Sequence, residues 1–364
     1  MGFDAYVDVA KHAGLREADA LLEALARLEG EPGEIADTLR RHHLIRLVRG
    51  VLPEERLRAR LRPELVGALS TRRPVGRVPV GTLLRTFDEV RQALDAAGVP
   101  ILVLKGFTFA ERLYGGLERR PQHDVDVLVR PRDFRRATAL LAGLGFARYD
   151  RDLHSLTVQR GAIQVDVHRH LRWAPAFAID EDAVWGTAVA VPIDGIAVPT
   201  LSDEYAVVAL VLAAFEDVGQ GMAKLKQLLD LHLLLRELDA ATDWAGFFTR
   251  RAGENLLGVA VNVLALVTTL FDADTELPRL SGALAPHRAR TALVHRERVL
   301  ALVSAPAKHP ANLAWFARVY PGSLLHYLVW FWWGGFPANL RRLGPAWLGE
   351  QLAVVYRSSR GERS

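Results

Sequence analysis

Apolar positions recur at helical spacing over both ends of the chain, whereas the middle alternates with the two-residue period of strands. Near the N-terminus, Leu21, Leu22 and Leu25 fall on one helix face. Residues 201–364 read as helical, with a strongly amphipathic run over 222–238. The pattern predicts an α+β fold, in which a small mixed β-sheet core is flanked by a helical N-terminal region and a helical C-terminal lobe.

Three parts follow from this pattern: a helical region over 1–75, a core over 76–200 and a helical lobe over 201–364. The elements expected in the core are a helix over 82–97, a strand over 101–104, a helix from 106 to 115, a strand over 124–129, a helix over 131–144, a hairpin of strands over 153–159 and 162–170, and short strands over 189–193 and 196–200. Arg160-Gly161 supplies the hairpin turn. The first strand is apolar throughout, which is typical of a strand buried on both faces.

Composition places the chain among ordinary globular proteins, because 50% of its 364 residues are hydrophobic and 24% are charged. The net charge of +4 is mild, and basic and acidic residues are interspersed. This balance favours a small anionic substrate over a nucleic-acid surface. The chain has no cysteine, so disulfides, thiolate zinc sites and cysteine nucleophiles are excluded.

No run of about 18–20 apolar residues, the length that a membrane span needs, occurs in the sequence. The nearest approach is 256–271, which Asn262 interrupts and which we interpret as a buried helix. The N-terminus lacks the pattern of a signal peptide, so a cytoplasmic location is expected. A tryptophan-rich stretch over 327–336 has two interpretations, a peripheral contact with a membrane or an acceptor, and packing of the C-terminal helices, which we favour.

Two aspartates mark the strand that carries the chemistry. Asp124 and Asp126 alternate with Val125, Val127 and Val129, so both carboxylates project from one face while the valines enter a core. Neighbouring carboxylates raise each other's pKa unless a cation lies between them. Mg²⁺ is the simplest such cation, since it takes carboxylate oxygens and leaves positions open for phosphate groups.

A third carboxylate is available on a later strand. In AIQVDVHRH, Asp166 and His168 share the face opposite to Val165 and Val167. If this strand joins the same sheet, Asp166 completes a site in which two metal ions support in-line attack on a nucleotide phosphate. For His168 two interpretations stay open: contact with substrate or support of Asp166, and a packing or surface histidine.

The run LKGFTFAERLYGGLERRPQHDVDVLV, followed by VDVH, resembles the polymerase-beta-type nucleotidyltransferase superfamily, and most of all its bacterial nucleotidyltransferase branch. The resemblance implies that Asp124 and Asp126 are metal ligands and catalytic residues, with Asp166 as the third carboxylate. It places Lys105 and Gly106 at the phosphate-binding turn. The usual Gly-Ser is absent here.

The same resemblance suggests nucleotide-binding roles for several other residues. No serine follows Gly106, and Thr108 offers a hydroxyl close to that position. Lys105 offers a positive charge that would replace the serine's contact with the triphosphate. Arg120 is predicted to clamp phosphate, because a guanidinium binds two oxygens at once, with a solvated loop arginine as the alternative. Lys224 and Lys226 admit two interpretations. One of them, with Lys224 as the candidate nucleotide-binding residue, reaches the triphosphate from the C-terminal lobe; the other, a charged helix face, is the one that we favour for each lysine.

The basic run Arg40, Arg41, His42 and His43 admits two interpretations, the lining of a substrate cleft and a solvated helix face. We favour the solvated face. The helix that starts after Gly106 presents free backbone N–H groups and is therefore an anion site.

These features together predict a Mg²⁺-dependent nucleotidyltransferase with two metal ions. It would move a nucleoside monophosphate from an NTP, with ATP as the expected donor, to a hydroxyl or phosphate of a small-molecule, sugar or peptide acceptor. Nucleic acid is not expected as the acceptor. Two alternatives remain: phosphoryl transfer at the same site, as in a kinase, and a non-catalytic nucleotide-binding regulatory protein.

Overall fold

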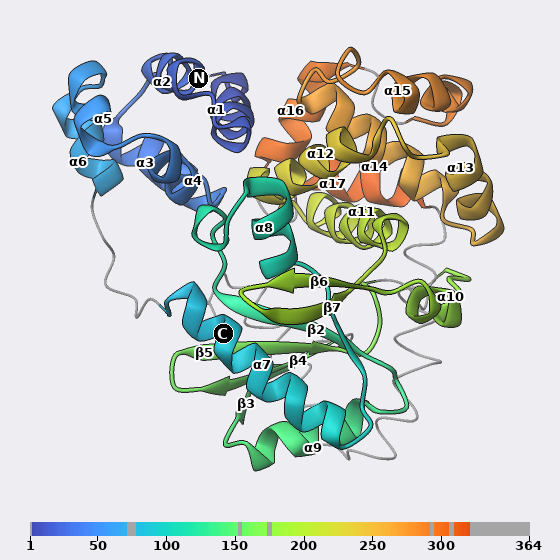
Figure 1. The fold of residues 1–364 in the computed structure, drawn as a ribbon. Coiled ribbons are helices and arrows are strands. Elements are labelled where there is room, and N and C mark those ends of the chain that lie inside the picture. Colours follow the sequence, from blue (N-terminus) through green and yellow to red (C-terminus); the bar gives the residue numbers. More distant parts are fainter. Residues whose placement is uncertain are drawn as a thin grey trace.

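The computed structural model describes residues 2–70, 78–151, 155–172, 177–291, 295–305 and 309–320 (Figure 1). The tryptophan-rich stretch over 327–336 lies outside these residues. The strands are β1 (Ile101–Val103), β2 (Asp124–Val129), β3 (Ala147–Arg151), β4 (Ser155–Arg160), β5 (Ile163–His168), β6 (Val189–Ile193) and β7 (Ile196–Thr200).

The helices before the last strand are α1 (Asp4–Leu15), α2 (Ala18–Ala26), α3 (Pro32–Arg41), α4 (Ile45–Val51), α5 (Glu54–Arg60), α6 (Pro63–Ser70), α7 (Val80–Ala96), α8 (Phe107–Tyr114), the 3₁₀ helix η1 (Leu117–Arg119), α9 (Phe134–Gly143) and α10 (Glu181–Gly186). Those after it are α11 (Asp203–Gly219), α12 (Leu225–Leu238), α13 (Trp244–Gly253), α14 (Leu257–Leu270), α15 (Pro278–Leu284), the 3₁₀ helix η3 (Ala285–Arg290), α16 (Arg296–Ser304) and α17 (Pro310–Val319).

The strands form one mixed seven-stranded sheet in the order β3-β4-β5-β2-β1-β7-β6. β2 pairs with β5 and β1 with β7 in parallel, and the other pairs are antiparallel. The predicted α+β class and the predicted hairpin are confirmed. The sequence analysis did not predict β3, an edge strand whose residues 147–150 are all exposed, so no alternation of buried and exposed positions marks it.

One face of the sheet is covered by α7 and α9, which lie together on the side away from the other helices (Figure 1). Val125, Val127 and Val129 are buried in this layer, together with Phe87 of α7 and Leu141 of α9. The alternation along β2 is therefore confirmed, because its valines enter a core and its aspartates leave from the opposite face.

The opposite face carries the rest of the molecule. The N-terminal helices and the helices after β7 share one hydrophobic core with Leu128 of the sheet and Phe109 of α8. Ion pairs join the two helical regions, Lys11 to Glu276 at 2.7 Å and Arg296 to Asp4 at 2.9 Å. The boundaries at 75/76 and 200/201 stay a prediction, but the two helical regions pack as one layer above the sheet.

Helix α14 is buried along most of its length, as the sequence predicted for 256–271. Among the described residues, no helix combines the length and the apolar character that crossing a bilayer requires.

Candidate active site

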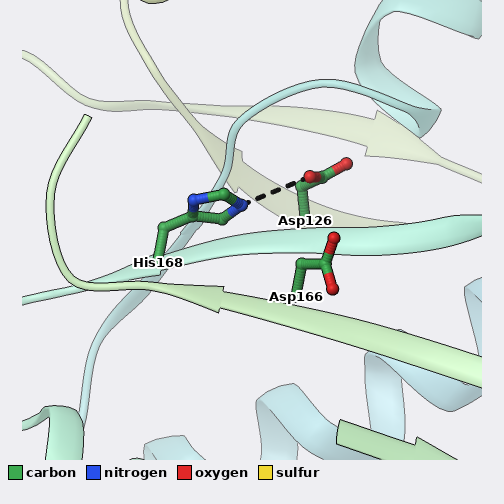
Figure 2. A group of neighbouring side chains, drawn as sticks. All are labelled: Asp126, Asp166 and His168. Atoms are coloured by element: carbon green, nitrogen blue, oxygen red, sulfur yellow. Dashed lines mark hydrogen bonds and ion pairs between the residues drawn. The ribbon is translucent and has the colours of Figure 1, made fainter. Parts of the chain in front are cut away.

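The parallel pairing of β2 with β5 brings Asp126 and Asp166 together, because the two residues are partners in the strand register. Figure 2 shows both carboxylates and the His168 ring on one side of this strand pair. The possible ligand atoms of Asp126, Asp166 and His168 all lie within 4.8 Å of one another. Asp124 stands outside this group of three, half-buried at the start of β2.

Asp126 is 6% exposed and has two cationic or polar partners. The Lys105 Nζ lies 3.4 Å from one carboxylate oxygen, and the His168 Nε2 lies 3.3 Å from the other. Burial acts to raise the pKa of Asp126, but Lys105 and then His168 outweigh it and hold this pKa well below its usual range. Asp126 is therefore a carboxylate anion at neutral pH.

Asp166 has the opposite electrostatic environment. Burial, and after it the charge of Asp126, raise the pKa of Asp166 above its ordinary value. Its Oδ1 atom is buried and has no hydrogen-bond partner among the described residues, and the same holds for the His168 Nδ1. A buried carboxylate oxygen without a partner is costly, so this position favours a cation. The oxygen-rich set fits a hard divalent ion such as Mg²⁺.

The turn between β1 and α8 lies beside this group. Gly106 has φ +80°, a left-handed conformation that a side chain would strain, and a Cβ there would come within 2.9 Å of the Gln122 Oε1. The Thr108 hydroxyl is buried and has no hydrogen-bond partner among the described residues. Lys105 points from the turn to Asp126, so the turn places a cation and the free N–H groups of a helix start next to the carboxylates.

Arg120 is buried rather than solvated, so the alternative of a loop arginine in solvent is wrong. Its Nε and Nη2 donate to the two oxygens of Asp230 on α12, at 2.9 and 2.6 Å. The Tyr114 hydroxyl donates to the same carboxylate at 2.8 Å. This network joins Tyr114 of α8 and Arg120, the residue after η1, to α12 in the C-terminal lobe. The contact of Arg120 with phosphate stays a prediction.

Lys226 and Lys224 stand at the start of α12. The side chain of Lys226 is 17% exposed, and its Nζ lies 3.8 Å from an Asp230 oxygen. Burial, and then the charge of Arg120, lower the pKa of Lys226 to about 7. A freely solvated helix face is therefore wrong for Lys226. Lys224 is exposed and precedes the helix as its N-cap residue.

Two adjoining cavities meet at Lys105, Asp124 and Asp126. One, of about 120 Å³, is lined on its other sides by side chains that include Arg120, Lys224, Lys226, Gln122, His43 and His123; we call it the basic pocket. The other, of about 750 Å³, is lined among others by Asp166, Thr157, Arg172, Glu216 and Asp217; we call it the open cleft. Both cavities thus reach the β2 carboxylates, and we call them the two chambers of the site.

Two residues that line the open cleft, His42 and Arg172, were not predicted as site residues from the sequence. His42 is 3% exposed and its Nδ1 accepts a hydrogen bond from the Leu225 N–H, so a solvated face is wrong for this residue. Arg172 lies 3.2 Å from Glu216 and 3.0 Å from Asp217, and it lines the open cleft. The run of basic and histidine residues at the end of α3 was a signal that could have indicated a site role for His42. No local pattern in the sequence marked Arg172.

A family model described as "Uncharacterised nucleotidyltransferase" matches residues 29–272, a range that includes every candidate residue above. Among solved structures, the antibiotic-resistance factor ANT(2'')-Ia is 19% identical, over 48% of this chain and 96% of its own, with a TM-score of 0.38. An antigenic nucleotidyltransferase-like protein from Paracoccidioides brasiliensis is 17% identical, over 56% of this chain and 92% of its own, with a TM-score of 0.35. No curated protein matches the sequence.

Proposed function

We propose a specific activity from the premise that this chain belongs to the family of uncharacterised nucleotidyltransferases and is therefore a transferase. The resemblance carried by Lys105, Gly106 and the Asp124–Asp126 pair is thereby confirmed at the level of the family. The proposed reaction moves a nucleoside monophosphate from an NTP to an oxygen of a small acceptor, with release of pyrophosphate.

One observation carries the proposal: Asp126 and Asp166 are register partners next to the Gly106 turn, and the buried Oδ1 of Asp166 has no hydrogen-bond partner in the part of the chain that the structure describes. Asp126 and Asp166, with Asp124 and His168 beside them, would hold Mg²⁺, expected as two ions. The metal would supply Lewis-acid stabilisation of the charge that develops on the phosphate oxygens.

The two chambers divide the substrates by charge. Four cationic side chains (Lys105, Arg120, Lys224 and Lys226) and two carboxylates (Asp124 and Asp126) line the basic pocket. The open cleft is lined by six carboxylates and four cationic side chains. A triphosphate suits the first balance, so we assign the NTP tail to the basic pocket and the acceptor to the open cleft.

In this arrangement an acceptor hydroxyl oxygen bonds to the α-phosphorus. The bond from the α-phosphorus to the bridging oxygen breaks, its electron pair leaves with pyrophosphate, and the acceptor proton passes to Asp166. Lys105 and Lys226 offset the negative charge of the triphosphate, and the helix start after Gly106 offers N–H donors. The size of the open cleft suits a small molecule, a sugar or a peptide end.

Thermal stability with ATP, GTP, CTP and UTP, each with and without Mg²⁺, tests the nucleotide half of this proposal. A metal-dependent rise of the melting temperature is expected for wild type and for Asp95→Asn, a surface control on α7, but not for Asp126→Asn. Turnover is then followed by product mass. Addition of a nucleoside monophosphate supports the proposal, whereas addition of a phosphate alone would replace it with phosphoryl transfer.

A further inference from the structure

His43 stands in the basic pocket although it belongs to the N-terminal helical region. It follows α3 with φ 58°, a left-handed conformation that favours glycine or asparagine. Its N–H donates to the Arg40 carbonyl and the next N–H, from Leu44, donates to the Leu39 carbonyl, which ends the helix.

The corner between α3 and α4, residues 42–46, is fixed to the site at several points. The Lys226 N–H donates to the His42 carbonyl at 3.3 Å, and the Leu225 N–H donates to the His42 ring, also at 3.3 Å. Arg46 donates to the Gln122 carbonyl at 3.4 Å. The corner is thus hydrogen-bonded to the first turn of α12 and to the loop before β2, two of the segments that line the basic pocket.

The surroundings of His43 match those of a group that meets an anion. Its ring centre lies 6.2 Å from that of His123, and Lys224 and Lys226 line the same cavity. Burial, and then the charges of these two lysines, His123 and His42, lower the pKa of His43 to about 3. The ring is therefore neutral and keeps one N–H donor for a phosphate oxygen without adding to the repulsion among the cations.

We infer that His43 contacts the β- and γ-phosphates of the bound NTP, the part that leaves as pyrophosphate, so that the N-terminal helical region completes the active site. This inference rests on the proposed function, because it takes the basic pocket as the place of the triphosphate. It adds a substrate contact that comes from outside the sheet and the C-terminal lobe.

The test compares His43→Asn and His43→Gly with wild type and with His12→Gln, a control on α1 whose ring pairs with Glu17 and which does not line the basic pocket. Asparagine and glycine both accept the left-handed backbone. Calorimetry measures the binding of inorganic pyrophosphate, ATP and AMP in the presence of Mg²⁺. AMP is the matched ligand, since it lacks both phosphates that His43 would contact.

Both His43 variants are expected to lose about tenfold or more in affinity for pyrophosphate and ATP, the scale of one hydrogen bond to a charged group. Their affinity for AMP and their melting temperatures should stay near those of wild type, within about 4 °C. A purely structural His43 would instead weaken all three ligands together or lower the melting temperature.

Two results separate the failures. If wild type binds pyrophosphate and ATP but the His43 variants bind them equally well, the inference is overturned and the proposed function stands. If wild type binds neither ligand with Mg²⁺, the proposed function is overturned and the inference falls with it.

Discussion

Asp126 and Asp166 are direct partners across two parallel strands, yet within the described part of the chain Asp126 has an ion pair with Lys105 and Asp166 has none. Burial and the charge of Asp126 raise the pKa of Asp166, whereas Lys105 and His168 hold the pKa of Asp126 down against the effect of burial. The two carboxylates therefore affect stability with opposite signs. A carboxyl group with a raised folded pKa opposes folding above its ordinary pKa, and a carboxyl group with a lowered folded pKa favours folding there.

The first prediction uses this opposition. Asp166→Asn should raise the melting temperature at pH 7 to 8, and the gain should vanish as the pH falls toward 4. Asp126→Asn should lower the melting temperature at the same pH. Each variant should lose about 100-fold or more in turnover. Loss of a residue that only supports a metal ligand already costs about 10- to 100-fold, and these two carboxylates are proposed as the ligands themselves. Melting curves from pH 4 to 8 check the signs, and equal signs for the two variants would contradict the argument.

A second prediction concerns Lys105, whose Nζ lies 3.4 Å from Asp126 where a metal ion would also be attracted. Lys105→Met should bind Mn²⁺ more tightly in the absence of nucleotide, by up to about tenfold, because a competing positive charge is gone. The same variant should bind ATP more weakly. Titration followed by the electron paramagnetic resonance of free Mn²⁺ measures the first effect, and an unchanged or weaker Mn²⁺ affinity would argue against the competition.

The buried pair of Arg120 and Asp230 supports a third prediction. Arg120→Met or Asp230→Asn alone should lower the free energy of unfolding by about 3–5 kcal/mol, since each leaves an uncompensated buried group. Tyr114→Phe removes one hydrogen bond to Asp230 and should cost about 1 kcal/mol. Urea denaturation measures all three.

The double variant Arg120→Met with Asp230→Met is the control for that prediction. It should lose much less stability than the sum of the single variants, because both charges are removed together. Additive losses would show that the two side chains act independently.

The fourth prediction follows from the pKa of Lys226, which burial and Arg120 lower to about 7. A lysine with a depressed folded pKa opposes folding while it is charged in the unfolded chain, so Lys226→Met should stabilise the protein. The gain should be largest below pH 7 and disappear as the pH approaches about 10, the ordinary pKa of lysine.

The same residue gives nucleotide binding a pH dependence. The ATP affinity of wild type should fall as the pH rises above 7, since Lys226 must take up a proton to meet the triphosphate. Lys226→Arg stays charged over this range and should show a flatter profile. Parallel profiles for the two proteins, measured by calorimetry from pH 6 to 9, would remove Lys226 from the triphosphate contacts.

Local periodicity carried a large part of what could be known from the sequence. The alternation in 124–129 fixed which side chains of β2 enter the core, and the alternation in 163–168 did the same for β5. The glycines at 106 and 115 marked both ends of α8, because each has a positive φ. These features depend on residues a few positions apart, so they can be predicted from the sequence alone.

The relations between distant segments were decided only by the tertiary structure. The strand register pairs Asp126 with Asp166, two residues 40 positions apart in the chain, and it depends on how β5 enters the sheet. Arg120 finds Asp230 at a separation of 110 residues. His43 reaches the basic pocket because the N-terminal helices share a core with the C-terminal lobe. No local pattern encodes such contacts, since they arise from burying apolar surface over the whole molecule.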